Sequence, residues 1–266
     1  MQKMIWSGQG PVYFGKYDPV NGTPEMGYMT NIYQIGCANR KLTTTPSRET
    51  RRVKESCSGQ RLDIMEVETS KELNVSLEMV EFDRETLARA FFATSTLQAG
   101  GTVTAETFPT VAEGDIVFLK HAGASSIVLT DSTMDGETPD PQALTAEGEG
   151  RNYRVIDASQ GTIQILDLDG IVQPIKAAYT YASYGNIAAF TATNVRTGII
   201  FAGKNQDGHK ARVIIPNISL SMSGEFNWMA EEESVLAMEG PAFYVPELDT
   251  ESGLYGPFMR IDALPD

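Results

Sequence analysis

The stretch SKELNVSLEMVEFDRETLARAFF, residues 70–92, changes its hydrophobic period half-way along. Its first half alternates strictly between apolar and polar residues, and the apolar ones are Leu73, Val75, Leu77 and Met79. Alternation with a period of two is typical of a strand that buries one face and wets the other. The stretch therefore predicts a two-faced strand over Glu72–Phe82.

The second half of the stretch predicts a short helix. Leu87, Ala90 and Phe91 recur at helical spacing behind Asp83, and Asp is a good N-cap residue. We expect this helix to cover Arg84–Thr94.

The rest of the chain is typical of a mainly β protein. Short segments rich in Val, Ile, Tyr, Phe and Thr are bounded by Gly, Pro, Asn or Asp, which is the pattern of strands separated by turns. Many short strands at regular spacing predict a β-sandwich or barrel-like domain with one flanking short α-helix, not a doubly wound sheet. Besides Glu72–Phe82, we expect strands at Pro11–Lys16, Tyr28–Gly36, Gln60–Glu68, Asp115–Lys120, Ser126–Asp131, Tyr153–Asp157, Thr162–Leu166, Ile175–Ser183, Gly198–Gly203, Lys210–Ser223, Glu233–Met238 and Tyr255–Ile261.

A change of composition near Gln98 predicts an inserted small β domain. The segment Gln98–Gly185 has twelve acids and four bases, against 35 acids and 21 bases in the whole chain. We expect the main domain to consist of residues 1–97 and 186–266, with the inserted domain at 98–185. A long irregular excursion of a single domain is the alternative.

The bulk charge and the absence of site motifs exclude several classes of function. A net charge of −14 argues against a general nucleic-acid binder, which must neutralise phosphates with Lys and Arg. The two histidines, His121 and His209, have no companion at metal-ligand spacing, and no GxSxG elbow is present. We therefore expect no enzyme, no catalytic residue, no metal and no cofactor.

Two further features of the sequence concern cysteines and membranes. We expect Cys37 and Cys57 to be free, buried thiols rather than a disulfide. The longest uncharged run, Ala177–Val195, is full of Thr, Ser, Asn, Gly and Tyr. We interpret it as strand and loop rather than as a membrane helix.

One segment reverses the charge of the chain. Asn39–Lys54, NRKLTTTPSRETRRVK, has one acid and six bases, and we expect it to be a loop or a long hairpin. It can be a solvated loop, a nucleic-acid contact, or a contact with an acidic protein surface. The chain itself supplies such surfaces, among them Glu231, Glu232 and Glu233, so self-association has an electrostatic route. The six bases are Arg40, Lys41, Arg48, Arg51, Arg52 and Lys54.

The order of these parts resembles the tail tube protein, or major tail protein, of bacteriophages with long non-contractile tails. The resemblance rests on IGCANRKLTTTPSRETRRVKESCSGQRLD, then KELNVSLEMVEF, then ETLARAFF, a Gly-rich joint, and later FAGKNQDGHKARVIIPNISLSMSGEFNWM. It covers roughly Val12–Thr94 and Ile187–Ile261. The stretch Thr102–Ser183 resembles the extra outward-facing domains of such proteins only in its position and β character.

The resemblance implies a structural virion protein, made in the cytoplasm of the host bacterium and located in the virion tail. Tube proteins of this kind form hexameric rings that stack into a hollow conduit for genome delivery. Implied partners are the chain itself, the tail terminator, tail tip and tape-measure proteins, and double-stranded DNA that passes without specific binding. A long loop after the early strands reaches the adjacent ring. On this basis we expect the six bases of Asn39–Lys54 to form the inter-ring contact, with Glu231–Glu233 as their acidic partner.

The same resemblance assigns a role to the wet face of the two-faced strand. Asn74, Ser76 and Glu78 are expected to face the lumen. The segment NISLSM predicts a similar strand with Ile218, Leu220 and Met222 buried, and its expected lumen-facing residues are Asn217, Ser219 and Ser221. An ordinary sheet with one solvated face gives the same alternation. The alternative function is a carbohydrate-binding or adhesin-like β-sandwich module of a phage tail tip.

Overall fold

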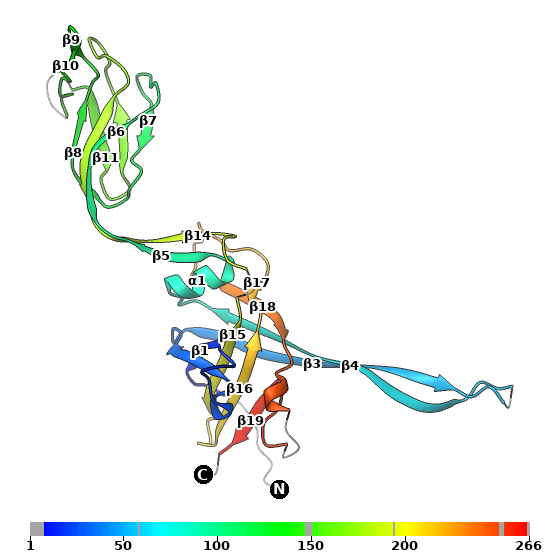
Figure 1. The fold of residues 1–266 in the computed structure, drawn as a ribbon. Helices are drawn as coiled ribbons and strands as arrows, with labels where there is room; N and C mark the ends of the chain where they lie inside the picture. Colours follow the sequence, from blue (N-terminus) through cyan, green and yellow to red (C-terminus); the bar gives the residue numbers. More distant parts are fainter. Residues whose placement is uncertain (1–7, 58, 147–150, 194, 250–252, 265–266) are drawn as a thin grey trace. The chain divides into compact units, whose positions relative to one another are not determined.

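The computed structural model describes residues 8–57, 59–146, 151–193, 195–249 and 253–264. The chain is mainly β and forms two compact units (Figure 1). Unit 1 contains the chain up to Ser95 and from Ile187 onward, and unit 2 is Thr96–Asn186. These boundaries lie within two residues of those expected at positions 98 and 185.

Unit 1 is built on one large sheet. Its strands are β1 (Val12–Tyr17), β2 (Met29–Gln34), β3 (Asn39–Lys54), β4 (Asp63–Met79), β15 (Thr197–Lys204), β16 (Lys210–Ile218), β17 (Ser221–Met222), β18 (Leu236–Ala242) and β19 (Arg260–Ala263). The strand order is β2-β1-β15-β16-β18-β4-β3, with β17 paired to β18 and β19 paired to β16. Two short 3-10 turns, η1 (Pro24–Met26) and η2 (Pro246–Leu248), lie in its loops.

The sheet of unit 1 divides where β16 meets β18, because these strands share a single residue pair, Ile218 with Ala242. Buried side chains from both parts of the sheet belong to one hydrophobic core. Two β layers packed on a shared core are the arrangement of a β-sandwich. The core includes Phe14, Ile199 and Ile215 from one part and Leu73, Val75, Leu77, Met79 and Met238 from the other.

Helix α1 (Arg84–Ala90) packs on this core as the sequence predicts, although it is shorter. The Asp83 carboxylate accepts a hydrogen bond of 2.7 Å from the Thr86 N–H, which confirms Asp83 as the N-cap. The helix ends at Ala90 and not at Thr94, since Phe92 adopts a left-handed φ of 50° that interrupts the helical backbone. Thr94 instead begins a strand.

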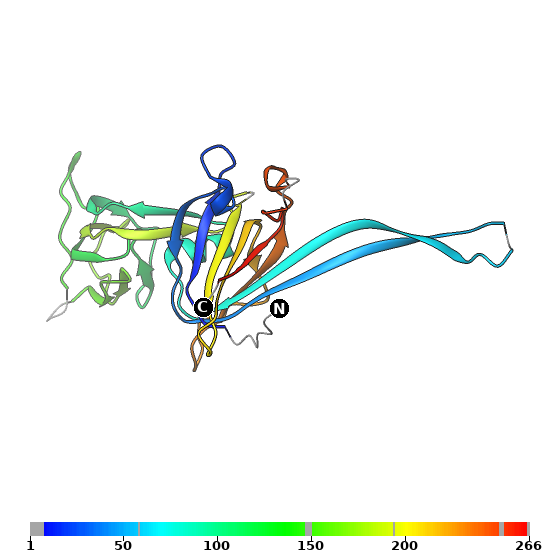
Figure 2. The same ribbon diagram turned by 90° about the horizontal axis from the view of Figure 1, so that it is seen from below.

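The strands β3 and β4 form a long hairpin. The sequence predicted separate strands at Gln60–Glu68 and Glu72–Phe82, but β4 is one continuous strand. The basic segment Asn39–Lys54 is the other strand of the hairpin, β3. Residues Leu73–Met79 of β4 pair with β18 as well as with β3, whereas Asp63–Glu72 pair with β3 alone. The far half of the hairpin therefore runs beyond the other strands of unit 1 (Figure 2). The burial of Leu73, Val75, Leu77 and Met79 is confirmed.

Unit 2 is a small β-sandwich of its own. Its strands are β6 (Gly101–Thr107), β7 (Ile116–Phe118), β8 (Ala124–Thr130), β9 (Met134–Asp135), β10 (Thr138–Pro139), β11 (Tyr153–Asp157), β12 (Thr162–Ile165) and β13 (Lys176–Tyr181). Two three-stranded sheets, β11-β12-β7 and β6-β13-β8, contribute to one core around Leu129, Ile163 and Tyr179. The strands β9 and β10 pair with each other.

Two further strands, β5 (Thr94–Gln98) and β14 (Tyr184–Ala188), pair with each other where the chain passes between the units. The uncharged run that starts at Ala177 contains most of β13 and all of β14, so its interpretation as strand and loop is confirmed. Within the described residues, no helix is long and apolar enough to cross a membrane.

Candidate functional site

Four neighbouring strands of unit 1, in the order β17-β18-β4-β3, present a polar face on the side away from the core. In the middle row, Ser221 pairs with Glu239 and Glu239 pairs with Ser76. Thr43 of β3 continues this row on the other side of Ser76. One flanking row consists of Thr45, Asn74 and Pro241, and the other consists of Lys41, Glu78 and Ala237. We call the residues of these two rows and of the middle row the polar face.

The structure brings together most of the residues that the sequence assigned to one wet surface. Asn74 is exposed on the polar face, and Ser76, Glu78 and Ser221 are half-buried there. Ser219 is half-buried next to the same face, where its N–H donates to the Pro241 carbonyl at 3.2 Å. Segments far apart in the sequence therefore build one surface.

Asn217 does not belong to this surface, and the expectation that it faces water is wrong. The residue is 8% exposed, and its Oδ1 is buried without a hydrogen-bond partner among the described residues. The reason is that both faces of β16 are covered: Ile214 belongs to a different hydrophobic cluster from Ile215 and Ile218. A strand buried on both sides does not divide its residues into dry and wet faces. Ile218 and Leu220 are buried as expected, and Met222 is half-buried.

The polar face is short of positive charge. Its one base, Lys41, pairs with Glu78 at 3.0 Å, and Glu239 adds a second acid. The remaining residues are small or uncharged. A shallow depression of about 420 Å³ lies over Asn74, Ser76, Ser221 and Glu239. Such a face offers an approaching phosphate no uncompensated cation.

The four-stranded strip has two open edges. Among the described residues, β3 pairs only with β4, and β17 pairs only with β18. An open edge presents unpaired N–H and C=O groups and is a template for pairing with another chain.

The basic segment Asn39–Lys54 is largely neutralised by its own chain, which the sequence did not predict. Lys41 pairs with Glu78 at 3.0 Å and Arg48 with Glu68 at 3.7 Å. Two further pairs are Arg52 with Asp63 at 3.3 Å and Arg40 with Glu233 at 3.4 Å. Because β4 is rich in acids, cross-strand pairs form along the hairpin. Among the described residues, only Arg51 and Lys54 of the six bases form no ion pair.

The three acids Glu231–Glu233 differ in whether they form an ion pair. Glu233 pairs with Arg40 of the same chain, and both side chains remain exposed, so its expected role as a partner for another copy stays a prediction. Glu231 and Glu232 are exposed and form no ion pair with the described residues. They follow Trp228 and Met229, which are 72% and 91% exposed.

The far half of the hairpin exposes apolar side chains near Arg51 and Lys54. Leu62, Ile64 and Met65 are between 56% and 65% exposed. Exposed apolar side chains beside charges are typical of surfaces that contact other proteins.

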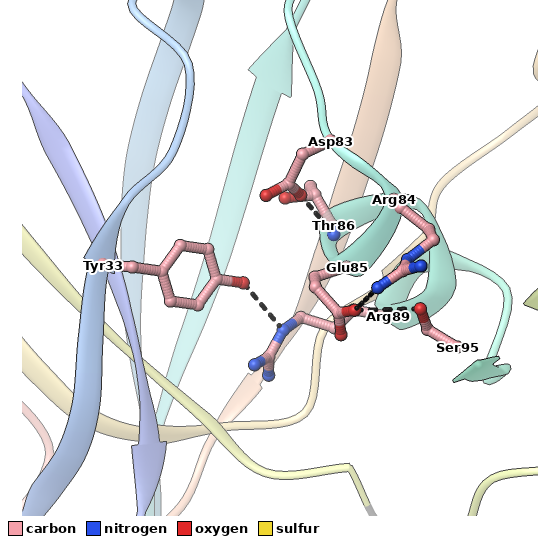
Figure 3. A network of polar contacts seen from close by, with 7 residues as sticks. All are labelled: Tyr33, Asp83, Arg84, Glu85, Thr86, Arg89 and Ser95. Carbon is pink, nitrogen blue, oxygen red and sulfur yellow. Dashed lines mark hydrogen bonds and ion pairs between the residues drawn. The ribbon is translucent and has the colours of Figure 1, made fainter. Parts of the chain in front are cut away.

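Helix α1 borders a second polar arrangement (Figure 3). The Arg89 Nε donates to the Tyr33 hydroxyl at 3.3 Å, and Glu85 accepts from Ser95 at 2.8 Å. Burial raises the pKa of Tyr33 above its ordinary value, while the Arg89 guanidinium opposes this rise. The side chains line a pocket of about 510 Å³ that also contains Lys16 and Arg196.

Other candidate chemistry has a structural explanation. In the described part of the chain, one group of three carboxylates, Glu113, Asp167 and Asp169, lies within 4.8 Å. Glu113 accepts the Leu168 N–H and Asp167 accepts the Asp169 N–H, which accounts for their positions. The His121 ring stacks on Tyr181 at 4.0 Å between ring centroids.

The two thiols depart from the expectation in one respect. Cys37 and Cys57 are free, as expected, but both are exposed, so the expectation of burial is wrong.

The match to a family model covers residues 5–262, which is nearly the whole chain, and the family is described as "Protein of unknown function UCP028589". The chain belongs to this family. No curated protein shows a significant match to the chain. The matched region includes both units and the connection between them, and function has to be inferred from the surfaces described above.

Several residues of the polar face were missed by sequence reasoning. Thr43 and Thr45 lie in β3, where three consecutive Thr and Pro46 obscure the alternation. Glu239 and Pro241 lie in β18, which begins and ends later than the predicted strand Glu233–Met238. The alternation of Leu236, Met238 and Gly240 with Ala237 and Glu239 was the available signal.

Proposed function

We propose that this chain is a tail tube subunit of bacteriophages with long non-contractile tails. It assembles into hexameric rings, and the rings stack into the conduit through which the genome passes into the host. The proposal makes it a structural virion protein and not an enzyme. The number six comes from the family resemblance and not from a feature of the single chain.

The observation that carries the proposal is the polar face with an open edge on each side. The strip β17-β18-β4-β3 has one buried face and one face of small polar side chains with two acids and one base. Edge-to-edge pairing between copies would join these strips into a continuous wall. When the edges meet around a ring, no edge is left open, which removes an aggregation liability.

The charge of the polar face supports passage of DNA rather than its retention. Non-specific binding to DNA depends on Lys and Arg that neutralise phosphates. On this face the only base is already paired with Glu78. DNA would therefore be a transient occupant, while the lasting partners are other copies of the chain and the terminator, tip and tape-measure proteins of the tail.

The hairpin β3–β4 supports stacking of rings. Within the described residues, its far half pairs only within itself. It exposes Leu62, Ile64 and Met65 beside Arg51 and Lys54, which form no ion pair in that part of the chain. A projecting arm with an apolar tip suits a contact with the next ring. The ion pairs inside the hairpin leave fewer free charges for the contact between rings than the sequence alone suggested. Apolar side chains would therefore contribute more of the binding free energy of that contact.

A second candidate function has one observation in its favour. On unit 2, Phe118 is 66% exposed on edge strand β7, and its register partner is Thr162. Arg154 and Gln164, joined by a 2.7 Å hydrogen bond, lie on the neighbouring strands. An exposed ring beside amide and guanidinium groups suits a sugar-binding surface, as in a tail-tip module.

Electron microscopy of the purified full-length protein separates the two candidates. Rings or tubes with a central channel support the tail tube function. Discrete particles together with measurable binding to an oligosaccharide panel that Phe118→Ala abolishes support the tail-tip module.

A further inference from the structure

The pocket beside α1 collects positive charge in a strongly acidic protein. Lys16, Arg89 and Arg196 all contribute to its lining, and the volume is about 510 Å³. Among the described residues, none of the three forms an ion pair. The carboxylate in the described lining, Glu85, is held by Arg84 at 3.2 Å and by Ser95. The lining therefore contains three cations and one carboxylate in a chain with a net charge of −14.

The two guanidinium groups of the pocket are fixed in place. Arg89 donates to the Tyr33 hydroxyl at 3.3 Å (Figure 3). It also donates to Thr197 Oγ1 at 2.5 Å. The Arg196 Cζ lies 3.5 Å from the centre of the Phe243 ring, and its Nη1 is buried without a hydrogen-bond partner. Fixed cations reduce the entropy lost on binding an anion.

A complementary surface lies on the other flank of α1. Trp228 and Met229 are among the most exposed apolar side chains, and Trp228 stacks on Phe91 with ring centroids 6.3 Å apart. Glu231 and Glu232 follow them directly and are exposed. We call Trp228–Glu232 the acidic Trp228 loop. This loop combines exposed apolar side chains with two negative charges, which are complementary to the positive charges of the pocket.

The helix itself separates the two surfaces. Glu85, Ala88 and Arg89 line the pocket, whereas Leu87 and Phe91 pack toward the core and the Trp228 side. Each helical residue turns by about 100°, so positions 87 and 91 point away from the side formed by 85, 88 and 89. One copy thus carries a donor surface on one flank and a receptor surface on the other. Heterologous contacts of this kind close into rings when the rotation between copies fits.

We propose that the acidic Trp228 loop of one copy docks in the cationic pocket of a second copy. The carboxylates of Glu231 and Glu232 then meet Lys16, Arg89 and Arg196, and Trp228 is the apolar anchor at the rim. The inference rests on the proposed function, since it requires the chain to self-assemble. It adds a second lateral contact between subunits of a ring, beside the pairing of strand edges. A carboxylate of the chain itself is the occupant because every assembled copy brings both surfaces in equal number.

A charge-exchange experiment on the full-length chain tests the contact. In a Trp6→Phe background, Trp228 is the sole tryptophan and reports on its own burial. As the protein concentration rises, we expect sedimentation velocity to detect assembly. Over the same concentrations, the fluorescence emission of Trp228 should shift to shorter wavelengths. Lys16→Glu, or Glu231→Lys combined with Glu232→Lys, should each weaken assembly at least tenfold, and the three substitutions together should restore part of it. Lys210→Glu, at an exposed base outside the pocket, is the matched control.

The outcomes separate this inference from the proposed function. If the parent protein assembles and the Lys16→Glu variant assembles equally well with Trp228 still exposed, the docking contact is overturned while the tail tube function stands. If the parent protein never assembles, both are overturned. Circular dichroism verifies folding, and Lys16→Gln, which removes the charge and keeps the chain length of the side chain similar, should show the same loss with less risk of misfolding.

Discussion

Lys41 Nζ lies 3.0 Å from Glu78 Oε1 across the strands β3 and β4, on the polar face of unit 1. This pair cancels the only base of that face. Because both side chains remain partly exposed, we expect the pair to contribute little to stability, about 0–1 kcal/mol. Its consequence is a surface without free positive charge, in the place where the proposed function puts DNA.

Changing Glu78 to Lys should alter DNA passage more than folding. The substitution removes the partner of Lys41 and places two cations on the polar face. Six copies around a ring would then attract phosphate and slow genome release, with a dependence on salt. Release rates from assembled tails measure the effect, and Glu137→Lys on unit 2 is the control. Unchanged release from tails built of the Glu78→Lys protein would place this face outside the lumen.

Changing Leu77 to Ala should destabilise unit 1. Leu77 is fully buried in the core, so the substitution removes apolar contacts and leaves a cavity. A loss of about 2–5 kcal/mol in the free energy of unfolding is expected. Denaturant unfolding of the purified protein measures it, with Glu78→Ala at the neighbouring position as the control. A loss below about 1 kcal/mol would contradict the assignment of this side chain to the core.

Replacing Thr96–Asn186 by a short Gly/Ser linker should leave unit 1 folded and able to self-assemble. Unit 2 has its own core of buried residues, and the chain leaves and re-enters unit 1 at neighbouring strands, β5 and β14. Units of this kind tolerate removal when few contacts cross the boundary. Circular dichroism and sedimentation measure the result. A folded but monomeric deletion protein would mean that unit 2 takes part in the subunit contact.

Asp131 should make unit 2 sensitive to acid. Burial raises the pKa of this carboxyl group, but hydrogen bonds from Thr133, Gln142 and Val172 outweigh burial and leave the pKa below its ordinary value. A lowered folded-state pKa means that the stabilisation is present above the unfolded pKa of about 3.9 and is lost as the pH falls further.

The corresponding experiment compares acid unfolding of Asp131→Asn with that of the parent chain. At pH 7 the variant should be less stable, and between pH 4 and the folded-state pKa its stability should fall less steeply, as measured by thermal unfolding. Glu137→Gln, at an exposed position in the same region, is the control. Parallel pH profiles for Asp131→Asn and the parent would show that the buried carboxylate is not responsible.

The parts of the fold that the sequence predicted are those where one local pattern dominates. Leu73 to Met79 alternate because β4 has a dry and a wet face, and Asp83 caps α1 through a bond to a residue three positions away. Both features depend on neighbours in the sequence. Asn217 was misplaced because its burial depends on a second cluster, around Met29 and Ile200, that no local pattern reports.

The candidate surfaces were predictable only in part for the same reason. The bases of Asn39–Lys54 were visible in the sequence, but their partners were not, since cross-strand register decides that Lys41 meets Glu78 and Arg52 meets Asp63. The pocket formed by Lys16, Arg89 and Arg196 draws on three separate segments and leaves no motif. Long-range pairing, rather than residue type, determines which charges remain free.

The tip of the hairpin should govern the stacking of rings. Reversing Arg51 and Lys54, the bases without an ion pair in the described structure, to Glu should block tube growth and leave folded subunits and rings. Reversing Arg48 and Arg52, whose charges are already paired, should have a smaller effect. Raised salt should weaken the share of the stacking contact that Arg51 and Lys54 contribute, because exposed charges more than about 8 Å apart are largely screened at physiological ionic strength. Normal tubes from the Arg51→Glu and Lys54→Glu protein would make the hairpin a solvated arm.

The most direct test of the central claim is the image of the assembled protein. We expect electron micrographs of the concentrated full-length chain to show rings or tubes with a central channel, and averaged images to place the Ser76 and Glu239 side of the sheet on the channel wall. Discrete, unassembled particles at every concentration and salt, with or without added tail proteins, would contradict the tail tube function.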